Sequence, residues 1–379
     1  MHILIAPNAF KNSLDARDVA EAIRDGLMDS MLKCTIECFP IGDGGDGTAN
    51  LIIEKFKGET IKATLSDPLG RKIETSFGLI DHGETAIIEM ADTSGHRLLS
   101  EAELNPMLAS SFGTGEMIVA ALNHGVKKII IGLGGSATVD GGAGLLSALG
   151  VCFLDSSGME LVPNPEGLSG LSSIDLSRMD QRVLDCELIV LCDVSNYLLG
   201  LKGAAAVFGP QKGAQPSDVP RLESVLQKMS ELAGSSGLGD MSGVKHGGAA
   251  GGIAAALNVF LNARLVDGAQ YFLEMTGFEN NLRSCDLLIT GEGSLDEQTL
   301  HGKAPFAAAA AAKLLGIPVV GIAGKVPLEN TPALSDYFQV LIPLGNEPSD
   351  LQTAIINTRP NLVRTGRTIG NLFSVQKFN

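Results

Sequence analysis

The sequence predicts an α/β fold in which a doubly wound parallel-sheet domain, built from both ends of the chain, carries an inserted mixed α/β domain. Near both ends, short apolar strands alternate with helices through glycine-containing loops, as in a parallel sheet covered by helices. In the middle, strands follow one another through turns that suit hairpins. We expect the outer domain to comprise residues 1–66 and 281–379, the inserted domain residues 67–280, and the active site to lie in the cleft between them.

The two ends of the chain show the alternation of strands and helices most clearly. The N-terminal end is expected to form a strand to Ala6, a helix over Val19–Met28, a strand over Thr35–Ile41 and a helix from about Thr48. The C-terminal end is expected to form strands over Asp286–Thr290, Val319–Ala323 and Tyr337–Ile342, with a helix over Ala304–Leu315.

The middle of the chain has a different pattern. Three strands are expected over Thr60–Leu65, Lys72–Leu79 and Glu84–Glu89, joined by turn residues at 67–70 and 81–83. Further elements follow as buried strands over Lys127–Leu133 and Glu187–Cys192 and helices over Gly115–Asn123, Val219–Ala233 and Ile253–Leu261. Hairpins beside buried strands and helices predict a mixed α/β domain for this part.

Composition restricts the possible partners. The formal net charge of -15 argues against a nucleic-acid partner, because binding a phosphate backbone requires a basic surface. Any phosphate site must therefore act locally, through backbone N–H groups, a few lysines and a metal ion. The six cysteines lack a C-x-x-C pair, the start of the chain shows no signal-peptide pattern, and the Ala304–Leu315 stretch is too short to cross a bilayer. We therefore expect a cytoplasmic protein without a membrane partner.

A glycine-rich loop follows the strand expected at Lys127–Leu133. Residues 129–144 read I-I-I-G-L-G-G-S-A-T-V-D-G-G-A-G, and a helix is expected to begin immediately afterwards. Glycines let a backbone approach phosphate closely, and a helix N-terminus offers unpaired N–H groups. The loop lacks the Lys-Ser/Thr of a P-loop and the G-x-G-x-x-G spacing of a dinucleotide site. The alternative interpretation is a tight packing loop between strand and helix.

A second glycine loop carries two acids. In G-D-G-G-D-G-T at residues 42–48, Asp43 and Asp46 could hold Mg²⁺ or accept a hydroxyl proton. A calcium loop is excluded, because Gly45 and Gly47 occupy ligand positions and Thr48 replaces the required glycine. The alternative interpretation is helix capping by Asp46 or Thr48.

Acids and lysines also follow other expected strands. Glu292 and Asp296 come after the strand at 286–290, and Lys303 stands near the next helix start. Asp193 directly follows Leu188–Cys192, where an acid is costly to bury without a partner. The alternative roles are turn residues, caps and solvated charges. Glycines, acids and lysines at several strand ends together suit phosphoryl transfer.

The ordered motifs resemble the type I glycerate kinases (glycerate 2-kinases). They are I-A-P-N-A-F-K at 5–11, G-D-G-G-D-G-T at 42–48, G-G-S-A-T-V-D-G-G-A-G at 134–144, C-D-V-S-N at 192–196, G-P-Q-K-G-A at 209–214 and L-I-T-G-E-G-S-L-D-E-Q-T-L-H-G-K-A-P at 288–305. The resemblance implies ATP and D-glycerate as substrates, ADP and a phosphoglycerate as products, and a flavodoxin-like domain with a restriction-enzyme-like insert. The chain departs from the family pattern A-P-D-S-F-K-G-S-L at Asn8, Ala9 and Asn12, so position 8 supplies no carboxylate. It also has Tyr197 where proline is common.

These considerations give a set of predicted roles. Asp296 would orient or deprotonate the hydroxyl, Lys11 and Lys303 would stabilise the transferred charge, and the glycine loop would hold phosphates. The predicted catalytic residues are Asp296, Lys11, Lys303 and Asp193; the predicted cofactor-binding residues are Gly134, Gly135, Ser136, Thr138, Asp140, Gly141, Gly291, Gly293 and Lys212; the predicted metal ligands are Asp43, Asp46, Asp193 and Glu292.

Three alternatives remain open at this point. The 3-hydroxyl or another small hydroxy acid could be phosphorylated. A dinucleotide-dependent dehydrogenase could use the glycine loops, although the fingerprint after the first strand is missing. A small-anion binding protein is the third alternative, although bare carboxylates repel an anion. The protein is expected to be a monomer or a homodimer.

Overall fold

The structure, a computed structural model, describes residues 1–329 and 331–375, apart from the side chains of Gln298 and His301. The chain divides into two compact units, one formed by Met1–Asp43 with Ala269–Asn379 and the other by Gly44–Gly268. These boundaries differ from those expected from the sequence, which are 66 and 281. The first unit ends at Asp43 and not at residue 66, because α2 (Thr48–Lys55) and β3 (Glu59–Ser66) both contact β4 (Lys72–Ile80) of the second unit. Each unit is described separately below.

The first unit contains a five-stranded sheet in the order β13-β12-β11-β1-β2, and all its strand pairs are parallel. Counted along the chain within this unit, the order is the 2-1-3-4-5 order of flavodoxin-like doubly wound folds. The predicted fold class is therefore confirmed. The strands are β1 (His2–Ile5), β2 (Thr35–Cys38), β11 (Leu287–Ser294), β12 (Val319–Lys325) and β13 (Val340–Pro343).

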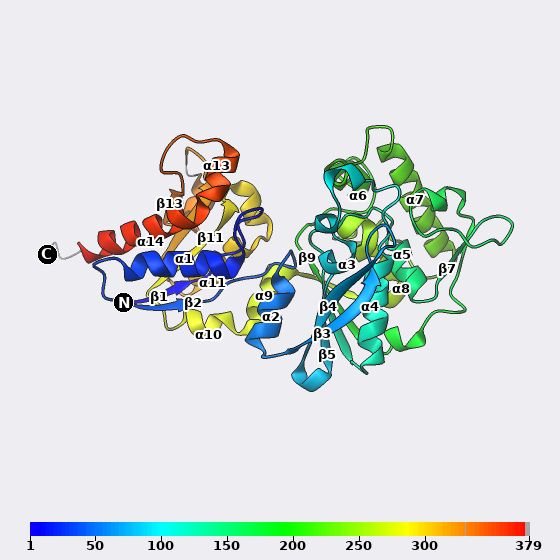
Figure 1. The fold of residues 1–379 in the computed structure, drawn as a ribbon, viewed down its shortest axis with the longest axis horizontal. Coiled ribbons are helices and arrows are strands. Elements are labelled where there is room, and N and C mark those ends of the chain that lie inside the picture. The colour runs from blue at the N-terminus through cyan, green and yellow to red at the C-terminus, as the bar shows by residue number, and fades with distance from the viewer. Residues whose placement is uncertain (330, 376–379) are drawn as a thin grey trace. The chain divides into compact units, whose positions relative to one another are not determined.

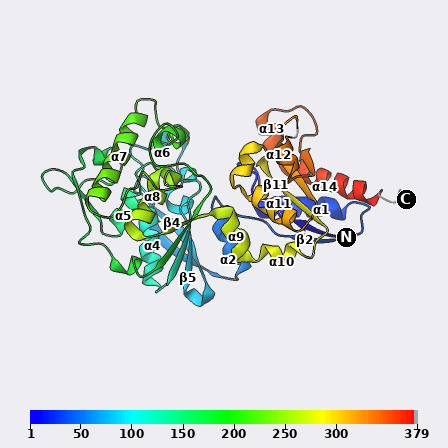
Figure 2. The same cartoon turned by 180° about the vertical axis from the view of Figure 1, so that it is seen from behind.

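Helices cover both faces of this sheet. Figure 1 shows α1 and α14 in front of the strands, and Figure 2 shows α11 and α12 in front of them from behind. Side chains alternate across a strand, so Ile3 and Ile5 join the core beneath α1 and α14, whereas Leu4 is buried on the other face. The helices are α1 (Ala16–Met28), α9 (Gly268–Thr276), α10 (Phe278–Leu282), α11 (Ala304–Leu314), α12 (Pro332–Ser335), α13 (Leu351–Ile356) and α14 (Thr358–Ser374).

The α1–α14 pair is held at unusually short range by glycines. A Cβ placed on Gly26 would lie 2.0 Å from the carbonyl oxygen of Val363, and one placed on Gly366 would lie 2.5 Å from that of Ile23. No side chain larger than hydrogen fits at either position unless the helices separate. The N-terminal and C-terminal helices therefore pack backbone to backbone.

The second unit contains a six-stranded mixed sheet in the order β10-β9-β6-β5-β4-β3. The pairs β10–β9, β9–β6 and β6–β5 are parallel, whereas β5–β4 and β4–β3 are antiparallel. The predicted hairpins and buried strands are thus confirmed within one mixed sheet. Besides β3 and β4, the strands are β5 (Thr85–Glu89), β6 (Lys128–Gly132), β9 (Glu187–Cys192) and β10 (Arg264–Asp267), with a separate hairpin of β7 (Cys152–Leu154) and β8 (Ser173–Asp175).

The core of the second unit lies mainly on one face of this sheet. Phe77 and Leu79 of β4 join a large apolar cluster that includes residues of α4, α5, α7 and α8. Gly78 points to the opposite face, where a Cβ would lie 2.3 Å from the side chain of Ile53 in α2. Besides α2, the helices are α3 (Ala91–Ser94), α4 (Phe112–Asn123), α5 (Ala143–Ala148), α6 (Ala204–Phe208), α7 (Val219–Ser235) and α8 (Ile253–Leu261).

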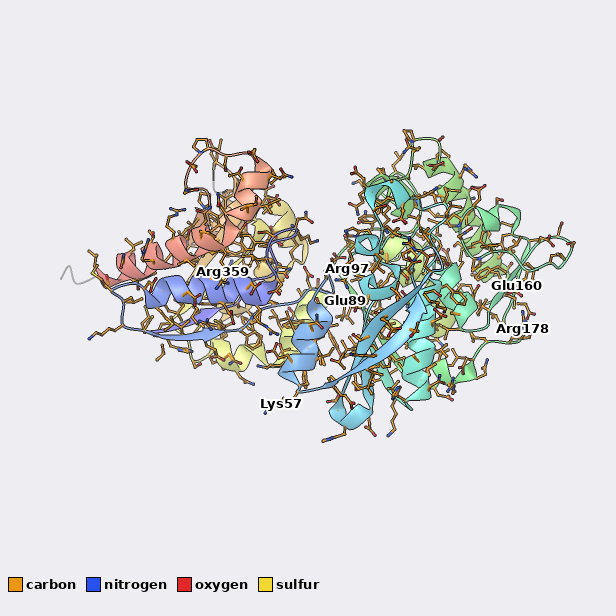
Figure 3. All side chains as sticks on the ribbon, in the orientation of Figure 1. Lys57, Glu89, Arg97, Glu160, Arg178 and Arg359 are labelled. Atoms are coloured by element: carbon orange, nitrogen blue, oxygen red, sulfur yellow. The ribbon has the colours of Figure 1, made fainter. Side chains whose placement is uncertain are left out.

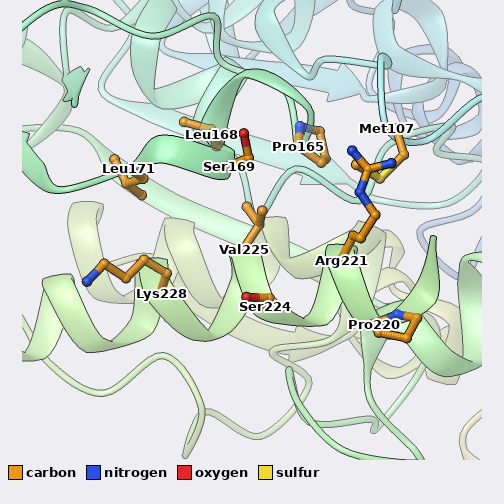
Figure 4. A pocket seen from close by; sticks show the side chains of 10 residues that line it. All are labelled: Met107, Pro165, Leu168, Ser169, Leu171, Pro220, Arg221, Ser224, Val225 and Lys228. Carbon is orange, nitrogen blue, oxygen red and sulfur yellow. The ribbon is translucent and has the colours of Figure 1, made fainter. Parts of the chain in front are cut away.

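A pocket of about 420 Å³ lies between α7 and the segment 165–171 in the second unit (Figure 4). Its lining includes Met107, Leu168 and Val225, and Arg221, which also lines it, is ion-paired with Glu166 at 2.7 Å. None of the predicted site residues lines it. Among the described residues, no helix combines the length and apolar character that crossing a membrane requires.

The α1–α14 seam gives a test of the fold. We expect Gly26→Ala to destabilise the protein by about 1–3 kcal/mol, because the added methyl group overlaps the α14 backbone. Gly345→Ala is the matched control, since no atom lies within 4 Å of its added Cβ. The measurement is urea unfolding followed by circular dichroism. Equal midpoints for the two variants would contradict the close approach of the helices.

Candidate active site

In the first unit, predicted site residues gather just after the end of β1 and along the last residues of β11. The segment after β1 is hydrogen-bonded to β11: Ala6 N donates to Ile289 O at 2.7 Å, Asn8 N donates to Gly291 O at 2.8 Å, and Thr290 Oγ1 donates to Ala6 O at 2.6 Å. Within this unit, β11 is the next strand after β2, and it pairs with β1 on the side opposite β2, so this is the topological switch point of the sheet. Ligands of open α/β sheets bind outside the carboxyl ends of strands at such a point.

Asp43, a predicted metal ligand, is held at this edge by Asn8. The Asn8 side-chain amide donates to Asp43 Oδ2 at 2.7 Å, and its carbonyl oxygen accepts from Ala9 N at 2.7 Å. The backbone contact leaves the amide nitrogen of Asn8 facing the carboxylate. The asparagine that departs from the family pattern therefore donates to an acid instead of supplying one.

Glu292 lies at the end of β11 and is 8% exposed. Burial raises the pKa of its carboxyl group, and the charge of Asp43 adds to the rise, while Lys303 and Thr299 oppose it. Glu292 Oε1 accepts from Lys303 Nζ at 3.2 Å and from Thr299 Oγ1 at 3.2 Å. The structure thus brings together Glu292 and Lys303, from the motif at 288–305, and Asp43, from the motif at 42–48.

Asp296 lies in the same strand-end segment. Its backbone N–H donates to Thr299 Oγ1 at 3.1 Å, and its carboxylate accepts from Ser294 Oγ at 3.3 Å. Because Thr299 also donates to Glu292, this one hydroxyl connects the two acids. Lys11 follows β1, and a Cβ on Gly293 would lie 4.0 Å from the Lys11 backbone nitrogen.

In the second unit, the glycine loop after β6 packs tightly against other backbone segments. Gly134 N donates to Gly44 O at 2.9 Å, and a Cβ on Gly134 would lie 2.3 Å from the Cα of Gly45. Farther along, Gly141 N donates to Gly251 O at 3.0 Å. Gly134 and Gly141 therefore do serve tight backbone packing. A role of this loop in phosphate binding stays a prediction.

Lys212 lies beneath this loop, in a short 3₁₀ turn at 210–212. It is 4% exposed, and its ammonium group donates to Ser136 Oγ at 2.7 Å and to Thr138 O at 2.8 Å. Burial lowers the pKa of Lys212 to about 7, while the charges of Asp140 and Asp193 oppose the shift. The structure thus brings the predicted residues Ser136, Thr138 and Lys212 into direct contact, with Asp193 close enough to interact electrostatically.

Asp140 is fully buried in the same loop. Its carboxylate accepts from Ser111 N at 2.8 Å, Ser111 Oγ at 2.7 Å, Gly142 N at 3.0 Å and Gly144 N at 3.1 Å. Burial raises its pKa, and these four bonds oppose the rise. The contacts join the start of α5 to the residue preceding α4. They support a role in holding the loop, and the cofactor contact expected for Asp140 stays a prediction.

A buried acid that the sequence patterns above do not single out lies at the end of β5. Glu89 is 3% exposed, and its Oε1 accepts from Gly47 N at 2.5 Å. Burial, then the charges of Asp92 and Asp46, raise the pKa of Glu89 to about 8. Arg97, which Figure 3 labels beside Glu89, forms an ion pair with Asp92. The sequence does contain a signal for this residue. Glu89 is an acid at the end of an apolar strand, just as Asp193 is an acid directly after another apolar strand.

The predicted metal ligands fall into two pairs. Asp43 and Glu292 interact within the first unit, whereas Asp46 and Asp193 belong to the second. Among the side chains that the structure describes, which leave out His301, no three acidic, histidine or cysteine side chains group as a metal site. Two carboxylates still suit Mg²⁺, which binds hard oxygen ligands and keeps several waters or phosphate oxygens. Asp43 and Glu292 therefore fit such an ion by their chemistry.

Acids, lysines and glycine loops at the ends of parallel strands define an α/β enzyme of the phosphoryl-transferring type. Residues 3–374 match the glycerate kinase family. The chain is 39% identical over 377 residues to a glycerate kinase of Bacillus subtilis (strain 168), covering 100% of this chain and 99% of that protein. It is 38% identical over 379 residues to a glycerate 2-kinase of Escherichia coli (strain K12), covering 99% and 98%.

A solved structure agrees with these sequence matches. The crystal structure of a protein named as glycerate kinase 2 from Salmonella typhimurium LT2 has a TM-score of 0.83 and 38% identity, over 99% of this chain and 98% of that one. The chain belongs to the glycerate kinase family and is a kinase. Membership of a kinase family implies a nucleotide substrate, and it disfavours the dehydrogenase and anion-binding alternatives.

The buried lysine gives a pH-dependent prediction. Between about pH 7 and the ordinary pKa of lysine near 10.5, the unfolded chain holds a proton on Lys212 that the folded protein lacks. Stability then rises with pH. Relative to Lys212→Met, the wild-type free energy of unfolding should increase by roughly 1–3 kcal/mol between pH 7 and pH 9.5.

Urea unfolding of wild type and Lys212→Met at several pH values measures the difference in their free energies of unfolding. Titratable groups that the two proteins share contribute equally to both, so their effect cancels in the difference. Lys228→Met, at an exposed position, controls for the loss of a lysine. A difference between wild type and Lys212→Met that stays constant over this range would show that Lys212 keeps its proton when folded.

Proposed function

We propose that the protein phosphorylates D-glycerate with ATP, giving 2-phosphoglycerate and ADP. Support comes from the names of the full-length relatives, one of which is a glycerate 2-kinase. The single observation that carries the chemistry is the meeting of Asp43, Glu292 and Lys303 at the switch point of the first sheet. Two acids and a cation at a ligand-binding edge are the groups that phosphoryl transfer uses.

The proposed reaction is a direct in-line transfer. The γ-phosphoryl group passes from ATP to the 2-hydroxyl oxygen of glycerate, the hydroxyl proton is released, and ADP leaves. Asp43 and Glu292 would hold Mg²⁺, whose contribution is neutralisation of the phosphate charge. Lys303 and Lys11 would stabilise the charge that develops on the transferred group.

Asp296 is proposed to orient or deprotonate the hydroxyl group. Its carboxylate accepts from Ser294 Oγ, and its backbone N–H donates to the Thr299 hydroxyl, which itself donates to Glu292. A carboxylate with such support is suited to accept a proton from an alcohol in the transition state. Gly291 and Gly293 would let phosphate approach the strand end.

In the second unit, the loop over residues 134–144 is proposed to contact phosphate groups of the nucleotide. Lys212 would keep Ser136 and Thr138 in place beneath it. It stays a prediction that residues of both units act on the same bound ATP and glycerate. The metal-binding roles of Asp46 and Asp193 also stay predictions. A cytoplasmic location, a monomeric or homodimeric state and the absence of a nucleic-acid partner also stay predictions.

The product of the reaction distinguishes the two hydroxyl groups. ³¹P and ¹H NMR of a mixture of D-glycerate, ATP and Mg²⁺ should show a phosphate signal coupled to the proton on C2. Coupling to the C3 methylene protons would instead assign a 3-kinase. Absence of any phosphoglycerate would overturn the proposed function.

Asp296→Ala tests the proposed catalytic acid. We expect kcat to fall about 100-fold or more, the usual range for loss of a positioned acid or base. ATP affinity, measured by isothermal titration calorimetry, should change by less than about threefold, because Asp296 is assigned to the acceptor hydroxyl. Glu297→Ala, at the neighbouring exposed acid, is the matched control. Unchanged turnover would remove Asp296 from the mechanism.

A further inference from the structure

Glu89 has no role in the proposed reaction, yet burying its carboxyl group costs free energy of folding. Its side chain is buried at the end of β5 near the charges of Asp46 and Asp92, and burial is the main cause of its pKa of about 8. Arg97 is ion-paired with Asp92. An apolar side chain of the same size, such as methionine, would pack there without the cost of burying a carboxyl group.

The carboxyl group of Glu89 contacts the backbone of the acidic glycine loop. Glu89 Oε1 accepts from Gly47 N at 2.5 Å. Gly47 has φ of 87° and precedes α2, and Thr48 Oγ1 accepts from Gly44 N at 3.1 Å within the same turn. The carboxyl group of Glu89 therefore holds the backbone immediately after Asp46 in its left-handed turn.

Asp46 connects this turn to the glycine loop after β6. Glu89 is buried, whereas Asp46 is exposed. A Cβ on Gly135 would lie 2.5 Å from Asp46 Oδ1, and Gly134 N donates to Gly44 O at 2.9 Å. The two glycine loops are thus in direct contact, and the carboxylate of Asp46 lies against the second of them.

We propose that Glu89 is a positioning residue for phosphoryl transfer, which fixes the turn at residues 44–48 so that the Asp46 carboxylate is held against the glycine loop. This inference rests on the proposed function. The buried acid acts through the backbone of Gly47 and touches no substrate. It requires a hydrogen-bond acceptor at this place, and it does not require a negative charge.

Two variants of similar size separate these requirements. Glu89→Gln keeps an acceptor oxygen for Gly47 N, whereas Glu89→Met fills the volume without one. We expect kcat to fall at least tenfold in Glu89→Met and to stay within threefold of wild type in Glu89→Gln. Glu84→Gln, at the exposed acid just before β5, is the control for charge loss and should leave kcat unchanged.

A double-mutant cycle with Asp46→Asn tests whether Glu89 acts through Asp46. If it does, Glu89→Met should lower kcat by less than twofold when Asp46→Asn is already present. Multiplication of the two effects would overturn the proposal, as would full activity of Glu89→Met in the wild-type background. If Glu89→Met does not fold by circular dichroism, Glu89→Asp replaces it in the cycle, because the shorter side chain withdraws the acceptor from Gly47.

The experiment distinguishes failure of this proposal from failure of the proposed function. Wild-type protein that forms no phosphoglycerate from D-glycerate and ATP would overturn the proposed function itself. Active wild-type protein with an equally active Glu89→Met variant would overturn only the role of Glu89. Active wild-type protein with an equally active Asp46→Asn variant would remove the residue through which Glu89 is inferred to act.

Discussion

The burial of charged side chains at the carboxyl ends of parallel strands is the constraint on which both clusters of site residues depend. A parallel sheet buries its strands on both faces, so the residues just beyond them enter a partly dry environment. Glu292 and Glu89 have raised pKa values for this reason. Lys212 comes from a 3₁₀ turn, and burial against the loop after β6 lowers its pKa. Hydrogen bonds partly offset the free-energy cost of this burial. Glu292 accepts one from Lys303, Glu89 accepts one from Gly47 N, and Lys212 donates one to Ser136. Such groups are expected where a protein handles charge.

Much of the fold could be predicted from the sequence, because local patterns specify its strands and many of its helices. The strand Glu187–Cys192 and the helix Ile253–Leu261 have the bounds that the apolar pattern predicts. The helix α14 was missed, since its buried face consists largely of small and polar residues such as Thr365, Gly366 and Gly370. Its position depends on close contact with α1, which sequence periodicity does not encode.

The candidate site was predictable by residue type and only partly by role. Strand-end acids and lysines were identified, and the structure brings Glu292, Lys303 and Asp43 together. Spacing alone did not reveal that Asp140 is enclosed by four hydrogen bonds, or that Glu89 meets the turn at Gly47. Both facts depend on contacts between segments far apart in the chain, so they follow from tertiary packing.

The division of the chain has a consequence for biosynthesis. The second unit is one continuous segment, whereas β1 pairs with β11, more than 280 residues later. On a ribosome, domains fold as units once their segments have emerged. The middle unit can therefore mature while β1 and β2 still wait for their neighbours. The first unit closes only when α14, the last described helix, has left the exit tunnel and docked on α1.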